Sequence, residues 1–77
     1  MSIRVRYFAS LRDHLGKSEE TLSPRDCTTV GEVWAKVHGG AALPYQVLCA
    51  VNMEYAETDT PVHAGDEIAF FPPVTGG

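Results

Sequence analysis

The sequence predicts an α+β fold in which one main helix crosses a mixed sheet. Three observations carry this prediction: strict alternation of apolar and polar residues over 2–8, a capped amphipathic helix after Thr29, and a short apolar strand over 67–71. The chain has 77 residues, 44% of them hydrophobic and 21% charged. This composition is typical of one small globular domain.

The first strand is expected over residues 2–8, and its core-facing side chains are Ile3, Val5 and Tyr7. Arg4 and Arg6 face the other side, and with Arg12 they form a basic cluster. The cluster fits either an acidic partner or an ordinary solvated strand face. Phe8 falls on the same side as the arginines, where it is either a surface contact or tucked beneath the strand end.

A short helix is expected over residues 10–15, with Ser10 as its cap and Gly16 as its stop. A polar strand over residues 17–22 follows at an edge of the sheet. The clearest helix begins after Thr29, because Thr29 and Glu32 fit a capping box and apolar residues follow at helical spacing. Trp34 lies on that apolar face and is expected in the core. Two glycines at 39–40 end the helix.

The second half of the chain reads as short strands joined by turns. Residues 47–51 fit a buried strand, residues 52–55 a tight turn into another short segment, and residues 64–66 a turn into the last strand. Strand, crossing helix and returning strand form the plan of a β-grasp, or ubiquitin-like, fold, in which a right-handed crossover places the last strand beside the first. We expect a β-grasp domain over residues 1–71 and a flexible C-terminal tail over residues 72–77, which leaves the sheet directly into solvent.

Several function classes are disfavoured by composition and motif content. A net charge of -4 argues against nucleic-acid binding, and no apolar run approaches the roughly 20 residues of a membrane span, so we expect a cytoplasmic protein. The three histidines lack metal-site spacing, and no cofactor motif occurs, so no metal or cofactor is expected. Cys49 alternates with valines and is expected as a buried apolar residue, whereas Cys27 lies in a polar stretch without an activating neighbour.

The last eight residues, "FFPPVTGG", are the unusual part of the chain. Pro72 and Pro73 hold the start of the tail extended, and its six residues reach roughly 20 Å at about 3.3 Å each. Gly76 and Gly77 have no side chains, so a narrow channel admits them. This design suits delivery of the terminal carboxylate into another protein's active site. A carboxylate needs activation before transfer, for instance as an acyl-adenylate that a sulfur nucleophile displaces.

The stretches "VRYFASLRDHLG" and "AVNMEYAETDTPVHAGDEIAFFPPVTGG" closely resemble the small, sulfur-carrying subunits of molybdopterin synthase. The resemblance implies a β-grasp fold and a Gly77 that a ubiquitin-activating-like adenylyltransferase adenylates with ATP before it becomes a thiocarboxylate. It also implies a large-subunit partner in a heterotetramer, where sulfur passes to a cyclic pyranopterin precursor. By the same resemblance Gly76 permits passage of the tail, and the partner-binding residues are Phe8, Phe71, Pro72 and Pro73.

Two alternatives remain. The first is a sulfur carrier for another pathway, such as thiamine or cysteine synthesis, which shares the fold and the terminal glycines. The second is a ubiquitin-like modifier, which passes the activated glycine to an amine instead of delivering sulfur. In all of these the chain is not catalytic alone.

Overall fold

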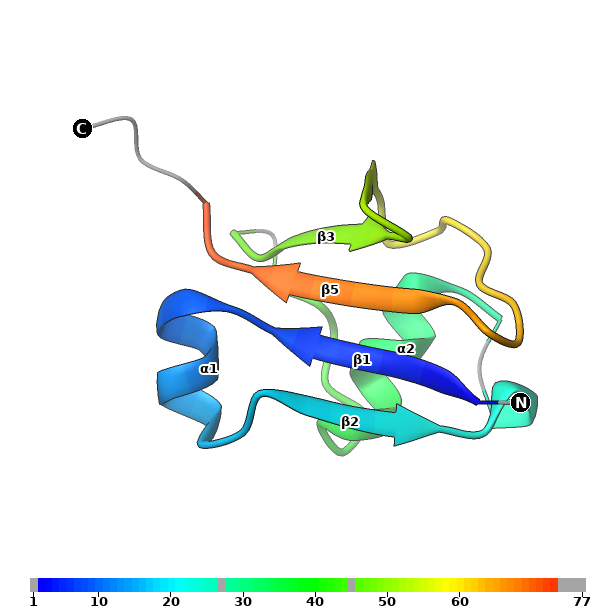
Figure 1. Ribbon diagram of the computed structural model, residues 1–77, viewed down its shortest axis with the longest axis horizontal. Coiled ribbons are helices and arrows are strands. Elements are labelled where there is room, and N and C mark those ends of the chain that lie inside the picture. The colour runs from blue at the N-terminus through cyan, green and yellow to red at the C-terminus, as the bar shows by residue number, and fades with distance from the viewer. Residues whose placement is uncertain (1, 27, 45, 74–77) are drawn as a thin grey trace.

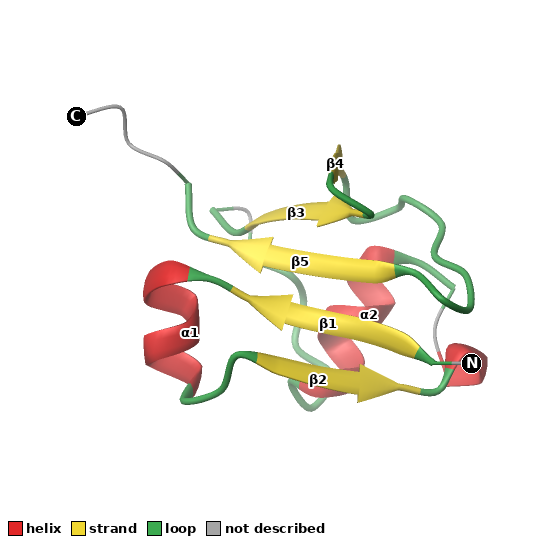
Figure 2. Cartoon of the chain, in the orientation of Figure 1, coloured by secondary structure: helices red, strands yellow, loops and turns green. Residues whose placement is uncertain are grey.

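The computed structural model describes residues 2–26, 28–44 and 46–73 (Figure 1). Within them the elements follow in the order β1 (Ile3–Tyr7), α1 (Ala9–Leu15), β2 (Glu19–Leu22), a 3-10 turn (Pro24–Asp26), α2 (Val30–Val37), β3 (Leu48–Val51), β4 (Glu54–Ala56) and β5 (Glu67–Phe71). The strands form one sheet in the order β2-β1-β5-β3-β4, and α2 crosses behind it (Figure 2). The predicted mixed sheet with one crossing helix is confirmed.

The last strand lies in the centre of the sheet, beside the first, as the crossover argument predicted. β5 pairs parallel with β1, with Val5 opposite Ile68 and Tyr7 opposite Phe70. On its other side β5 pairs antiparallel with β3, so that Leu48 lies opposite Phe71. Both neighbours of β5 are therefore hydrogen-bonded strands, and the C-terminal end of β5 is held from both sides.

The core fills the space between α2 and the inner face of the sheet. The alternation predicted for β1 is confirmed, since its three core-facing residues are at most 1% exposed. Trp34 is also buried, and its ring meets that of Phe70 edge-on with centroids 4.9 Å apart. The fully buried side chains from the sheet and the helix are Ile3, Val5, Tyr7, Val30, Val33, Ile68 and Phe70. Burying such side chains is the main source of stability in a domain of this size.

The start of α2 is capped, but only one half of the predicted capping box forms. The Thr29 hydroxyl accepts a hydrogen bond from the Glu32 backbone N–H at 3.3 Å. The Glu32 carboxylate accepts from the backbone N–H of Thr28 at 2.6 Å, and not from that of Thr29. The first amides of the helix also donate to the loop that precedes β5, from Gly31 to the carbonyl of Thr58 at 2.8 Å. A Cβ at position 31 would lie 3.1 Å from this oxygen. Glycine, which has no Cβ, lets the loop backbone come this close to the helix.

Helix α1 differs from the prediction at its start. It begins at Ala9, so Ser10 lies inside the helix, and the capping position is Phe8, whose side chain accepts no hydrogen bond. The prediction of a Ser10 cap was wrong because β1 continues directly into the helix through an extended Phe8 and an Ala9 with φ of 55°. Gly16 ends the helix with φ of 75°, as predicted.

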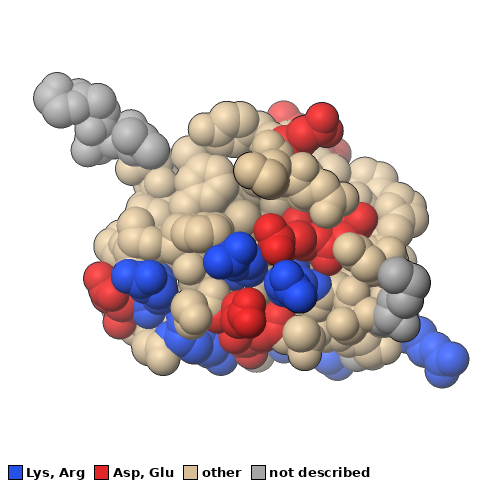
Figure 3. All heavy atoms as spheres, in the orientation of Figure 1, with Lys and Arg blue, Asp and Glu red and all other residues tan. Residues whose placement is uncertain are grey.

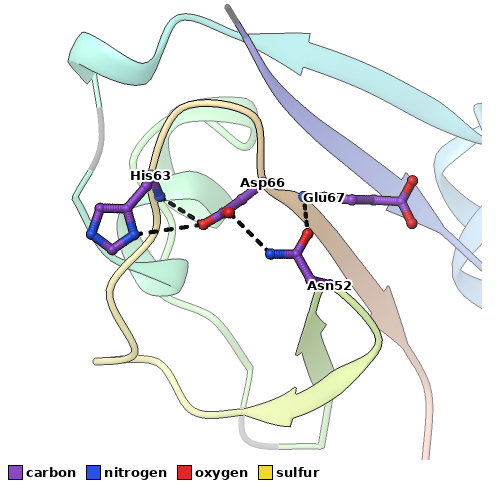
Figure 4. A network of polar contacts seen from close by, with 4 residues as sticks. All are labelled: Asn52, His63, Asp66 and Glu67. Carbon is purple, nitrogen blue, oxygen red and sulfur yellow. Dashed lines mark hydrogen bonds and ion pairs between the residues drawn. The ribbon is translucent and has the colours of Figure 1, made fainter.

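A polar network fastens the turn between β3 and β4 to the beginning of β5 (Figure 4). The Asn52 side chain donates to Asp66 Oδ1 at 3.0 Å and accepts from the Glu67 backbone N–H at 3.0 Å. Asp66 also accepts from the backbone N–H of His63 at 2.7 Å. The hydrogen bond from Asn52, followed by that from His63, lowers the pKa of Asp66 below its ordinary value. Asn52 and Met53 both have positive φ, as a two-residue hairpin turn requires.

Replacement of Asn52 by alanine is expected to lower the free energy of unfolding by about 1–2 kcal/mol, because it removes two hydrogen bonds and places alanine at positive φ. Asn52→Gly keeps the backbone conformation available and should lose less. Urea denaturation of the three proteins measures both effects. Equal losses in the two variants would exclude a contribution from backbone conformation, and no loss in either would exclude a contribution from the network.

Candidate functional site

The candidate site is the base of the C-terminal tail and the two surfaces beside it. β5 ends at Phe71 because Pro72 and Pro73 have no N–H to continue the ladder. Pro72 is half-buried and Pro73 is exposed. The predicted sulfur-bearing Gly77 and its neighbour Gly76 lie outside the described residues, and the flexibility predicted for the tail stays a prediction.

An apolar surface covers the outer face of the sheet next to the tail base. We call it the outer patch and define it by Phe8, Leu48, Tyr55, Ala69 and Phe71. Strand register places Leu48 opposite Phe71, and the Tyr55 and Phe71 rings lie with centroids 5.9 Å apart. Phe8 is 39% exposed and Tyr55 80% exposed. Of the two interpretations of Phe8, the surface position is therefore correct.

Charged side chains gather on the middle of the same face, away from the tail (Figure 3). Glu67 lies 3.6 Å from Arg4 and 3.9 Å from Arg6. The Arg6 guanidinium also lies 5.2 Å from the centroid of the Phe8 ring, within the range of a cation–π contact. Arg4 and Arg6 thus share one carboxylate on the solvated outer face of the sheet, and the alternative of an acidic partner for the basic cluster stays open.

On the side of the sheet that α2 covers, an open groove of about 610 Å³ adjoins the tail base. It runs between α1, the end of α2 and the loop before β3, and we call it the tail-base groove. Its apolar lining includes Leu11, Leu15, Trp34, Val47, Pro72 and Pro73. Both prolines form part of the wall of this open groove, and the predicted path of the tail beyond them lies outside the described residues.

A small polar cluster borders the groove. The Tyr7 hydroxyl donates to Glu20 Oε2 at 2.8 Å, so its contact with His38 Nε2 at 3.4 Å needs the proton on the histidine nitrogen. The His38 ring also lies against the indole of Trp34, with centroids 3.9 Å apart. Burial lowers the pKa of His38, and burial with the Glu20 carboxylate raises that of Tyr7. Both side chains are thus held by packing and hydrogen bonds at the edge of the groove.

The described residues hold no cluster of three or more groups able to bind a metal ion. Within the same ranges no helix is long and apolar enough to span a membrane. Cys49 is buried, its thiol lies 3.1 Å from the carbonyl oxygen of Ala56, and burial raises its pKa. It is therefore an inert core residue, as predicted. Cys27 lies outside the described residues.

Sequence reasoning missed two parts of this site. The first is Tyr55, which extends the outer patch. Its position could have been predicted from strand alternation, because the next residue, Ala56, packs against the core and Tyr55 must then face outward. The groove joins segments far apart in the chain, and its one local signal was the pair Leu11 and Leu15, one turn apart on α1.

Fold and site together define a small ubiquitin-like domain with apolar surfaces on both sides of the point where its last strand ends. The chain belongs to the ThiS family, whose model matches residues 5–77. It is 36% identical to the molybdopterin synthase sulfur carrier subunit of Escherichia coli, over 97% of this chain and 99% of the relative. It is 33% identical to the human sulfur carrier subunit, over 97% of this chain and 93% of the relative.

Solved structures share the fold. SAMP1 from Haloferax volcanii matches with a TM-score of 0.81 and 27% identity over the whole of both chains. SAMP1 stands for small archaeal modifier protein 1. A complex of subunits 1 and 2 of the molybdopterin-converting factor from Helicobacter pylori contains a chain that matches with a TM-score of 0.69 and 23% identity, over the whole of both chains.

Acidification should destabilise the domain through His38. Burial lowers the pKa of this ring in the folded protein, whereas the unfolded chain binds a proton near pH 6.5, so the stability that the neutral ring contributes above about pH 6.5 is lost as the pH falls. Thermal melting between pH 7.5 and about 5 should therefore show a steeper fall for the natural chain than for His38→Gln. His14 and His63 are present in both proteins, so their contributions to the pH dependence cancel in the comparison. Parallel curves would contradict the assignment.

Proposed function

We propose that this chain is the sulfur carrier subunit of a molybdopterin synthase, with Gly77 as the residue that bears the sulfur. The observation that carries the proposal is the match over nearly the full chain to relatives named as molybdopterin synthase sulfur carrier subunits. The chemistry of the described residues is compatible with it: Cys49 is buried with a raised pKa, and no cluster suited to a metal ion occurs among them. The reactive group is then the C-terminal carboxylate, and the domain presents it.

The proposed sequence of reactions begins with activation. A ubiquitin-activating-like enzyme transfers the adenylyl group of ATP to the Gly77 carboxylate, and pyrophosphate leaves. A nucleophile equivalent to sulfide then attacks the acyl carbon, the bond from this carbon to the AMP oxygen breaks, and a thiocarboxylate remains. In the large subunit this sulfur forms a bond to a cyclic pyranopterin precursor, and water cleaves the acyl–sulfur bond, so that Gly77 returns to a carboxylate. The chain itself contributes the length and direction of the tail and the surface that docks on the partner.

The tail base suits this delivery. β5 is paired on both sides, so Pro72 starts from a fixed point. Two successive prolines restrict the path of the chain and lower the entropy lost when the tail enters a channel. Gly76 would let the backbone pass a constriction that a side chain would block. These features support a role for Pro72 and Pro73 in orienting the tail toward its partner.

The outer patch supports docking on the large subunit. Phe8 and Phe71 lie on the outer face at the end of the sheet from which the tail begins, and Tyr55 extends the apolar surface. Exposed aromatic side chains beside a functional terminus are typical of an interface. The Helicobacter pylori subunits 1 and 2 form a protein–protein complex, which supports a large-subunit partner for this fold. We infer a heterotetramer with that partner.

A ubiquitin-like modifier is the second candidate, because the SAMP1 structure matches over both whole chains. A modifier uses the same activated glycine but passes it to a lysine amine, so the two functions differ in the acceptor and not in the domain. A carrier for thiamine or cysteine synthesis differs only in the final sulfur acceptor. The full-length relatives named for molybdopterin synthase favour the pterin acceptor.

Deletion of Gly77, or addition of one residue after it, is expected to abolish pterin sulfuration in a reconstituted assay. The fold should be unaffected, because residues 74–77 follow the last paired strand. Circular dichroism and thermal melting provide the control and should be nearly unchanged. Sulfuration retained by the extended chain would contradict the proposed function.

Replacement of Phe71 by aspartate is expected to weaken the complex with the large subunit by about 2 kcal/mol or more, as at interface hot spots. Met53→Asp is the matched control, since Met53 is 92% exposed and lies outside the outer patch. Isothermal titration measures both affinities. Unchanged binding together with a collapsed melting temperature would show that Phe71 serves the fold and not the interface.

A further inference from the structure

The tail-base groove has no assigned role, although it adjoins the residues that the proposed function depends on. It lies on the side of the sheet that α2 covers, so it is separate from the outer patch on the other face. Its volume of about 610 Å³ is within the range of ordinary ligand sites, and it is open to solvent. The groove has room for a large side chain and the backbone that carries it.

The groove walls select an uncharged, apolar occupant. None of the lining residues is acidic or carries a permanent positive charge, and the titratable ones are His14 and His38. Helix α1 has no fully buried residue, and its Leu11 and Leu15 are only half-buried where they face the groove. The apolar stripe of this helix is therefore incompletely covered by the described part of the chain. Covering it would remove further apolar surface from water.

A second feature of the groove wall is an indole whose hydrogen-bond donor the described part of the domain leaves unpaired. Trp34 lines the groove and is 5% exposed, and its indole Nε1 is buried without a hydrogen-bond partner among the described residues. A buried donor left unpaired costs free energy that a new acceptor would recover.

We propose that the tail-base groove binds a bulky apolar side chain, with its backbone, from the large subunit that takes up the tail. This inference rests on the proposed function. Pro72 and Pro73 form one wall of the groove, so a protein that binds the chain at the tail base also meets the rim of the groove. The outer patch and the groove then hold the tail base from opposite faces of the sheet and set the direction in which the tail enters the partner.

The test uses substitutions that enlarge a side chain in the groove, so that no existing contact of the domain is removed. Ala42 is exposed and lines the groove, so Ala42→Glu places a carboxylate among apolar walls and Ala42→Trp fills the space. Ala64 is also exposed but lies in the turn before β5, at the other end of that strand, so Ala64→Glu is the matched control for charge. The affinity of the full-length chain for the large subunit is measured by isothermal titration, and stability by thermal melting.

Both Ala42 variants should bind the large subunit about tenfold more weakly or worse, since a desolvated carboxylate or a filled groove excludes the partner's side chain. Ala64→Glu should stay within about twofold of the natural chain. Melting temperatures should be nearly unchanged in all three variants.

Unchanged affinity in both Ala42 variants, while the natural chain binds, would overturn the inference and leave the proposed function standing. An equal loss in Ala64→Glu and Ala42→Glu, with none in Ala42→Trp, would overturn it in favour of a net-charge effect. Lower melting temperatures with unchanged affinity would show that the chain itself covers the groove. A dimer of the isolated chain that Ala42→Glu abolishes, again with unchanged affinity, would assign the groove to a second copy. If the natural chain fails to bind the large subunit, the proposed function and this inference both fall.

Discussion

The parallel pairing of β1 with β5 is the contact on which the rest of the structure depends. Parallel neighbours need a long crossover, and α2 lies within that connection and covers the inner face. The pair Val5 and Ile68 is fully buried at the centre of the sheet. Because β5 is also bonded to β3, the chain passes from a strand that is paired on both sides to Pro72 without an intervening loop. A tail that starts from such a strand has a fixed origin.

Much of this arrangement could be predicted from local pattern. Alternation in β1 identified its core face, and the Thr29 cap with helical spacing located α2, because both signals arise from residues that are neighbours in the chain. The order of strands followed from the handedness of the crossover. The position of Phe8 on the outer face followed from strand alternation. Its exposure could not be predicted, because this depends on whether another segment of the chain covers the strand end.

The rest depended on tertiary contacts. Ser10 was a reasonable cap by residue type, but β1 runs straight into α1, and the helix starts before a serine cap can form. Glu32 satisfies Thr28 and not Thr29, a choice between adjacent amides that sequence does not determine. The tail-base groove arises where α1, the end of α2 and the loop before β3 meet, and no local pattern encodes that meeting.

The residues that stabilise the domain are different from the residue proposed to carry out its chemistry. Its described thiol is buried with a raised pKa, and the polar groups of His38 and Tyr7 are tied into hydrogen bonds. In the proposed function the reactive atom is carried on residues that follow the last strand, and the domain presents these residues to one active site for activation and to another for transfer. The outer patch and the tail-base groove then offer the large subunit two apolar surfaces beside the tail base.

The most direct test of this account is the intact mass of the protein isolated from cells that make molybdopterin, followed by mass analysis of its C-terminal peptide. A sulfur carrier should give a species heavier by the difference between a sulfur and an oxygen atom, with the change confined to Gly77. A ladder of larger conjugates joined through Gly77 to lysines, with no sulfur-bearing form, would contradict it and establish the modifier instead.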